Sequence, residues 1–98
     1  MEKKITVSSR FKKNALHLYD YLLIEFSAKT AYDFLDRLEK RIGFIYKHPH
    51  IGSPSRKKNH VRSVTLLPHN RIYYRLKDDE IVLLCIYDMR RDNSRNLY

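Results

Sequence analysis

Apolar residues recur at the period of an α-helix in two consecutive stretches of the first half of the chain. The first series is Phe11, Ala15, Leu18, Leu22 and Phe26, and the second is Ala31, Phe34, Leu35, Leu38, Ile42 and Ile45. Ser8 or Ser9 can cap the first helix and Ser27 the second, because a serine hydroxyl accepts hydrogen bonds from the free N–H groups of the first turn. The second helix must end near His48, because Pro49 disfavours helical geometry in the residue before it. Almost no linker separates the two stretches, so we expect an antiparallel helix hairpin.

The period of apolar residues changes to two in the second half of the chain. Residues 61–66, 71–77 and 81–87 predict three antiparallel strands with short polar turns between them. The last of these is apolar on both faces, so we expect it in the interior of the sheet. A short β-branched segment, residues 5–7, predicts another strand before the hairpin. Residues 48–60 have no period and contain glycine, proline and a charge run, which is typical of a loop.

The middle strand of the second half has two chemically different sides. Ile72, Tyr74 and Leu76 share one side, which we expect to meet the helices. The other side, which we expect to be open, carries Arg71, Tyr73, Arg75 and Lys77. The predicted fold is therefore a single two-layer α+β domain over residues 1–98, of order β-α-α-β-β-β, with both helices on one sheet face.

Positive charge is concentrated in one segment of the chain. The whole sequence has 20 basic and 11 acidic side chains, a net charge of +9. Residues 40–77 contain ten of the basic residues and none of the acidic ones, so the remainder has 10 basic against 11 acidic and a net charge of −1. Such a field attracts a polyanion and favours a nucleic acid, or a nucleic-acid machine, as partner. The alternative is a solubilising surface, although ordinary solvated surfaces mix both signs.

Several kinds of chemistry are excluded by what the sequence lacks. Cys85 is the one cysteine, which excludes an internal disulfide, and its apolar neighbours predict a buried structural thiol. No metal-ligand spacing appears, so we expect neither a metal nor a cofactor. The first residues lack the apolar stretch of a signal peptide, and no segment has membrane-spanning length. We therefore expect a cytoplasmic protein that does not bind membranes.

Four local motifs follow one another on the expected elements: residues 48–54, 61–62, 71–75 and 86–92. Together with the order and size of the elements, they resemble the RelE/ParE superfamily of bacterial toxins from type II toxin–antitoxin (plasmid stabilisation) systems. The resemblance implies an antiparallel sheet whose first strand lies beside the last. It also implies an acidic antitoxin as partner, and it leaves a homodimer open.

The superfamily contains two modes of toxicity. RelE-like members cut mRNA in the ribosomal A site, whereas ParE-like members inhibit DNA gyrase. ParE-like members have a long helix hairpin followed by a Pro-x-x-Gly-x-Pro loop, and residues 49–54 (PHIGSP) fit that spacing. The resemblance thus favours gyrase narrowly over the ribosome and mRNA. A third alternative is a non-toxic nucleic-acid-binding or interaction module.

The RelE-like alternative requires a particular set of catalytic groups. Metal-free RNA cleavage needs a base, an acid, and cations that stabilise the crowded phosphorane. The resemblance implies that Arg62, Arg71 and Arg90 are those cations, although Val64 stands where a second lysine is often found. The sequence therefore holds a cationic cradle for a phosphate.

The proton-transfer group of that alternative is less well defined. Tyr87 is the tyrosine candidate, with packing at the edge of the core as the alternative reading. His60 and His69 are further candidates, although each is more typical of a loop or turn. Asn96 falls near the functional tyrosine of the family, with Tyr98 two residues beyond. The acid and base thus stay open.

Residues expected to contact a nucleic acid or a target protein come from the loop, the open strand face and the tail: Arg56, Lys57, Lys58, Tyr73, Arg75 and Arg91. Tyr73 lies between arginines and can stack on a base, with cross-strand packing as the alternative. The loop cations can contact phosphates without sequence preference, or they can simply be solvated. In the tail, Asp88 and Asp92 are expected to form local ion pairs with their arginine neighbours.

Overall fold

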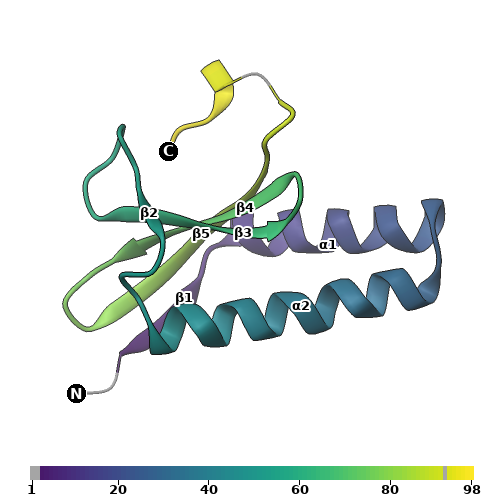
Figure 1. Cartoon of the computed structure of the whole chain (residues 1–98), viewed down its shortest axis with the longest axis horizontal. Helices are drawn as coiled ribbons and strands as arrows, with labels where there is room; N and C mark the ends of the chain where they lie inside the picture. Colours follow the sequence, from purple (N-terminus) through teal and green to yellow (C-terminus); the bar gives the residue numbers. More distant parts are fainter. Residues whose placement is uncertain (1–2, 92) are drawn as a thin grey trace.

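A five-stranded sheet packs against a helix hairpin in the computed structural model, which describes residues 3–91 and 93–98 (Figure 1). The elements are β1 (Lys4–Val7), α1 (Ser9–Glu25), α2 (Ala28–Lys47), β2 (Ser53–Pro54), β3 (Val61–Leu67), β4 (Asn70–Leu76), β5 (Glu80–Asp88) and a 3-10 helix, η1 (Asn93–Arg95). The predicted α+β order is confirmed. No helix among the described residues is long and apolar enough to cross a membrane.

The strands are arranged in the order β1-β5-β4-β3-β2. The last long strand, β5, lies in the interior and has β1 as its neighbour, as expected. However, β1 runs parallel to β5, with Lys4 opposite Glu80 and Val7 opposite Leu83, so the sheet is mixed rather than wholly antiparallel. The region predicted as a loop contains β2, which pairs with the start of β3. A proline is tolerated in β2 because this strand is at the edge of the sheet.

Serine caps fix where both helices begin. Ser8 Oγ accepts a hydrogen bond from Phe11 N (3.0 Å) and donates to the backbone oxygen of Leu84 (2.8 Å), so it joins α1 to β5. Ser27 Oγ accepts from Thr30 N (3.1 Å). The chain leaves α2 at His48, as the following proline requires. Both capping predictions and the predicted end of the hairpin are therefore confirmed.

The main core lies between the hairpin and one face of the sheet. Its buried residues are Phe11, Phe34, Leu38, Ile45, Val64, Leu66, Ile72, Tyr74, Ile81, Leu83 and Ile86. Leu76 packs against this core, so the predicted inner side of β4 is confirmed. In Figure 1 both helices continue past the strands on the right. The large side chains exposed there include Tyr21, Ile24, Phe26 and Tyr32.

The opposite face of the sheet has a small core of its own, made of Val61, Tyr73, Leu84, Cys85 and Tyr87. The pairing of β4 with β5 shifts by one residue after Tyr73, and this β-bulge brings both Leu84 and Cys85 to that face. Cys85 is 1% exposed, and burial raises the pKa of its thiol to about 11. The predicted structural role of this cysteine fits that environment.

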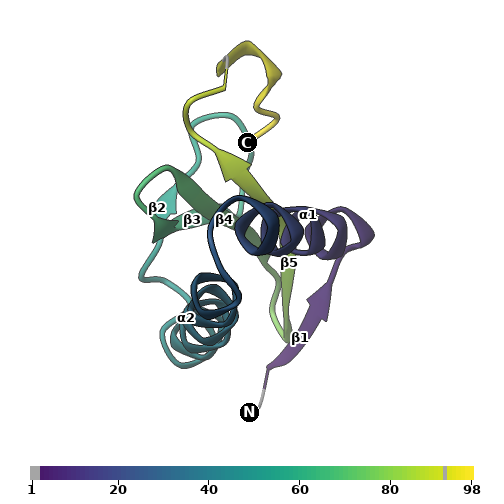
Figure 2. The same cartoon turned by 90° about the vertical axis from the view of Figure 1, so that its right-hand side faces the viewer.

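The C-terminal tail folds back over this second core (Figures 1 and 2). The Tyr98 ring lies 5.7 Å from the Tyr73 ring, and Asn96 Nδ2 donates to Tyr73 Oη (3.0 Å). Lys57 Nζ donates to the backbone oxygen of Asn96 (2.6 Å), and Ser55 Oγ donates to that of Tyr98. The expectation of an open face is therefore wrong around Tyr73, which is 7% exposed. The tail packs there because it supplies both an aromatic ring and a polar partner for the Tyr73 hydroxyl.

Candidate functional site

The loop after α2 is fixed to the sheet by the hydroxyl of Tyr74. This hydroxyl donates to the backbone oxygen of Pro49 (2.8 Å) and accepts from Gly52 N (3.1 Å). Burial raises the pKa of Tyr74, which keeps the hydroxyl protonated and able to donate. A Cβ at Gly52 would lie 2.6 Å from Tyr74 Oη and 2.8 Å from the backbone oxygen of Ser63. The loop approaches the sheet this closely because Gly52 has no side chain.

Arg62 also holds this loop. It lies opposite Tyr74 in the pairing of β3 with β4, so its side chain leaves the sheet on the hairpin side. Its Nη1 donates to the backbone oxygens of His50 (3.1 Å) and Gly52 (2.6 Å). The arrangement implied by the resemblance, with Arg62 in one cationic cradle with Arg71, is therefore wrong for this structure.

Arg71 leaves the sheet on the opposite face. Its Nε donates to Ser63 Oγ (3.1 Å), its Nη1 to Thr65 Oγ1 (3.0 Å) and its Nη2 to the backbone oxygen of Ser63 (3.1 Å). Arg75 shares this face with Val61, its neighbour across β3, and has no hydrogen-bond or ion-pair partner among the described residues. Of the two arginines on this face, Arg75 is thus the one without a side-chain partner among the described residues.

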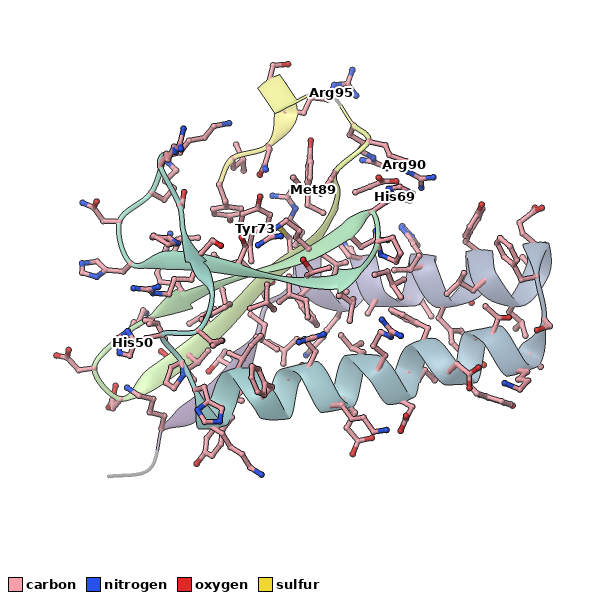
Figure 3. All side chains as sticks on the ribbon, in the orientation of Figure 1. His50, His69, Tyr73, Met89, Arg90 and Arg95 are labelled. Carbon is pink, nitrogen blue, oxygen red and sulfur yellow. The ribbon has the colours of Figure 1, made fainter. Side chains whose placement is uncertain are left out.

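A groove of about 620 Å³ runs between α1, the β3–β4 turn and the end of β5. Its lining brings together four predicted site residues: His69, Tyr87, Arg90 and Arg91. Figure 3 shows His69, Met89 and Arg90 next to one another, and Met89 N donates to the backbone oxygen of His69 (2.7 Å). Tyr87 belongs to the second core and is 5% exposed. The groove therefore brings His69 and two arginines of the tail next to a mostly covered tyrosine, and Arg10, His17 and Tyr21 of α1 also line it.

Arg90 is engaged by a neighbouring carboxylate. Its Nε lies 3.1 Å from Asp88 Oδ1 and its Nη2 lies 2.9 Å from Asp88 Oδ2. The hydrogen bond from the Arg90 side chain holds the pKa of Asp88 below its ordinary value. The predicted local ion pair is confirmed for Asp88, whereas Asp92 lies outside the described residues. A ligand anion in the groove must compete with Asp88 for this arginine.

The charge run in the loop after β2 is divided among different environments. Arg56 is exposed, whereas Lys57 holds the tail through the backbone of Asn96. The backbone N–H groups of Lys57 and Lys58 both donate to Ser55 Oγ (3.0 and 3.1 Å), which orders the start of the run. The Lys58 side chain lines a second pocket together with His60. The run is thus not one continuous binding surface.

Comparison with known proteins decides the family. The family model of the ParE toxin of the type II toxin–antitoxin system parDE matches residues 5–93. This chain belongs to the ParE toxin family. It is the toxin of a type II toxin–antitoxin system.

Solved structures agree with that assignment in fold. The chromosomal ParDE system from P. aeruginosa matches with a TM-score of 0.74 and 16% identity, over 88% of this chain and 95% of that chain. The E. coli DinJ–YafQ toxin–antitoxin complex matches with a TM-score of 0.67 and 11% identity, over 92% and 96%. The YoeB dimer from S. aureus matches with a TM-score of 0.57 and 19% identity, over 89% and 98%. Among curated proteins no match is found.

Several residues of this ParE-family toxin take part in ordered contacts that the sequence did not reveal. Asn96 is 9% exposed and holds the tail in place through two hydrogen bonds. Its Nδ2 donates to Tyr73 Oη, and its Oδ1 accepts from Tyr98 N (both 3.0 Å). Lys3, His50 and Lys77 meet in one pocket although they are far apart in sequence. No local pattern marks such residues, because their neighbours are set by the tertiary structure.

Proposed function

We propose that this toxin inhibits DNA gyrase. The observation that carries the proposal is the separation of Arg62 and Arg71 onto opposite faces of the sheet. An RNA-cutting site stabilises one phosphorane with cations that converge on it. Two arginines that leave a sheet in opposite directions do not meet at one phosphate. The proposal makes the chain an inhibitor rather than an enzyme.

The hydrogen bonds of these arginines support the same conclusion. Arg62 holds the Pro49-to-Pro54 loop, the segment whose spacing resembles ParE-like toxins. The guanidinium of Arg71 donates hydrogen bonds to Ser63 and Thr65 of β3. Arg62 therefore stabilises the loop that resembles ParE-like toxins, whereas the hydrogen bonds of Arg71 stay within the sheet.

We infer in addition that an acidic antitoxin neutralises the toxin. Residues 40–77 contain ten cationic side chains and no carboxylate, so this segment is complementary in charge to an acidic partner. A partly disordered partner that folds on binding can cover such an extended surface. Expression of the chain alone should stop growth, and co-expression with the adjacent reading frame should restore it. Equal growth in both cases, with soluble protein present, would contradict a toxic activity and support the non-toxic module.

Ribosome-dependent mRNA cleavage is the second candidate. The observation in its favour is the groove that gathers His69, Tyr87 and Arg90, because imidazole and phenol groups can transfer protons beside a cation. For this candidate, Arg90 must give up its ion pair with Asp88 and bind a phosphate of the mRNA instead.

Two assays with the purified chain separate the candidates. We expect it to block supercoiling of relaxed plasmid by gyrase and to leave mRNA on programmed ribosomes uncut, as read by primer extension. Arg71→Ala and Arg90→Ala should then change the inhibitory concentration no more than Lys13→Ala, a charge-matched control on α1. If the chain is instead a ribonuclease, either substitution should lower cleavage by about 100-fold or more. Cut mRNA with intact supercoiling would overturn the proposal.

A further inference from the structure

A basic pocket of about 460 Å³ lies at the end of β4 away from the groove. Figure 3 shows His50 at this end and His69 and Arg90 at the other. The pocket is lined by basic and imidazole side chains from separate parts of the chain: Lys3, His50, Lys58, His60, Arg62 and Lys77. Asp78 is the one carboxylate among its lining residues. With the histidines neutral, four cations and one anion give the lining a formal charge of +3.

Lys3 and Arg62 are held in place by backbone oxygens, which carry no formal charge. Lys3 Nζ donates to the backbone oxygen of Asp78 (3.1 Å), and Arg62 donates to backbone oxygens of the loop. Lys77 is 3.6 Å from Glu80 Oε1, which offsets part of its charge. A concave site of one sign concentrates the electrostatic potential and attracts anions.

Three further side chains of the lining are available to a ligand. Lys58, His50 and His60 have exposed side chains with no hydrogen-bond or ion-pair partner within the described part of the chain. Half-buried Leu76 also lines the pocket and offers apolar area. The pocket therefore combines free donors with apolar area.

His60 carries backbone strain at this pocket. Its φ of 64° is the one positive φ among the described non-glycine residues. A glycine adopts this conformation without steric cost, whereas other residues held there often occur at functional sites. Hydrogen bonds hold the backbone at and after this residue: Leu76 N donates to the backbone oxygen of His60, and Ser55 N donates to that of Val61 (both 2.8 Å). An imidazole is thus present where a glycine would fit with less strain.

We propose that this pocket binds a nucleotide through its phosphate groups. The volume lies in the range of small-molecule sites, and the apolar area of Leu76 suits a sugar or a base. Lysine, arginine and imidazole donors around a phosphate form charge-assisted hydrogen bonds. The nucleotide can be a free nucleoside diphosphate or part of a nucleic-acid strand, since both present the same phosphate chemistry. The proposal does not depend on gyrase inhibition.

Titration of the isotope-labelled full chain tests the proposal by NMR. The probes are pyrophosphate, ADP and a single-stranded oligodeoxythymidylate, and amide shifts should change saturably at residues 58–62 and 76–78. Saturation by ADP identifies a free nucleotide, whereas saturation by the oligonucleotide alone identifies a strand. Lys58→Ala and Lys77→Ala should each weaken binding of the effective probe about 5- to 10-fold. For the oligonucleotide, each should also reduce the log–log salt slope by about one.

His60→Gly separates binding from folding. It should weaken binding to a similar degree while leaving the melting temperature equal or higher, because glycine relieves the strain at this position. Lys13→Ala removes the same charge from α1, outside the pocket, and should leave the affinity within about twofold, because exposed charges beyond a Debye length are screened. Unchanged affinity in Lys58→Ala and His60→Gly would overturn the proposal. So would shift changes confined to the groove, or failure of all three probes to bind.

Discussion

Gly52→Ala should destabilise the fold through the loop that follows α2. An added Cβ would lie 2.6 Å from Tyr74 Oη, 2.8 Å from the backbone oxygen of Ser63 and 3.1 Å from Arg62 Cβ. The Ser63 oxygen cannot retreat easily, because β3 is paired with β2 on one side and β4 on the other. The loop must therefore move away from the sheet.

The size of the effect follows from the contacts that would be lost. Overpacking at a tightly packed position costs about 1–3 kcal/mol. Displacement of the loop also weakens the hydrogen bonds of Gly52 with Tyr74 and Arg62, each of which contributes about 1 kcal/mol. We expect a loss of about 3 kcal/mol in the free energy of unfolding. For a domain of this size that is a fall in melting temperature of about 10–25 °C.

Thermal and urea unfolding followed by circular dichroism measure this loss. Gly43→Ala is the matched control: no atom lies within 4 Å of an added Cβ, and Gly43 is exposed within α2. Alanine should stabilise that helix position by about 0.5–1 kcal/mol, so the two glycine substitutions should have opposite signs. Tyr74→Phe combined with Gly52→Ala should cost less than the sum of the single changes, because the closest clash disappears. If Gly52→Ala is as stable as Gly43→Ala, the close packing described for this loop is incorrect.

Two more predictions concern the second face of the sheet. Asn96→Ala should lower the free energy of unfolding by only about 1 kcal/mol, but it should free the tail and expose Tyr73. Nitration of Tyr73, mapped by mass spectrometry, should therefore increase. Unchanged nitration would show that the tail is held by other contacts. Cys85 should resist thiol reagents until the chain is unfolded, because its pKa is raised to about 11 by burial. The folded chain holds this proton more tightly than the unfolded chain, so stability relative to Cys85→Ala should fall as the pH rises from 9.0 through about 11; fast labelling of the native thiol would contradict the burial.

The helix hairpin and the strand order of the second half could be predicted because their signals are local. Periodicity and capping chemistry depend on residues a few positions apart, and Ser8 and Ser27 cap the helices as the spacing indicates. Two departures have non-local causes. The parallel direction of β1 is set by how the chain returns to the sheet after the hairpin, and β2 forms because the edge of β3 is free to pair. Neither leaves a period in the sequence.

The candidate site was predicted less well, because its geometry depends on which face each strand residue takes. Arg62 resembles a catalytic cation by position in the chain, yet alternation along β3 places it on the side of Val64 and Leu66, which are core residues. The side of the sheet that Arg62 takes can be worked out from the sequence once the inner face of β3 is known. The burial of Tyr73 cannot be worked out in this way, because the residues that cover it belong to a tail that returns from beyond β5.

The charge run of residues 56–58 shows why composition alone misleads about binding surfaces. As a sequence it is one basic patch, but in the structure Arg56 is exposed, Lys57 fastens the tail and Lys58 faces the basic pocket. Replacing all three residues together would remove a solvated charge, loosen the cover over Tyr73 and weaken the pocket at the same time. A loss of toxicity in that triple variant would not identify which surface contacts the target. Single replacements can identify that surface, because each one changes only one of these environments.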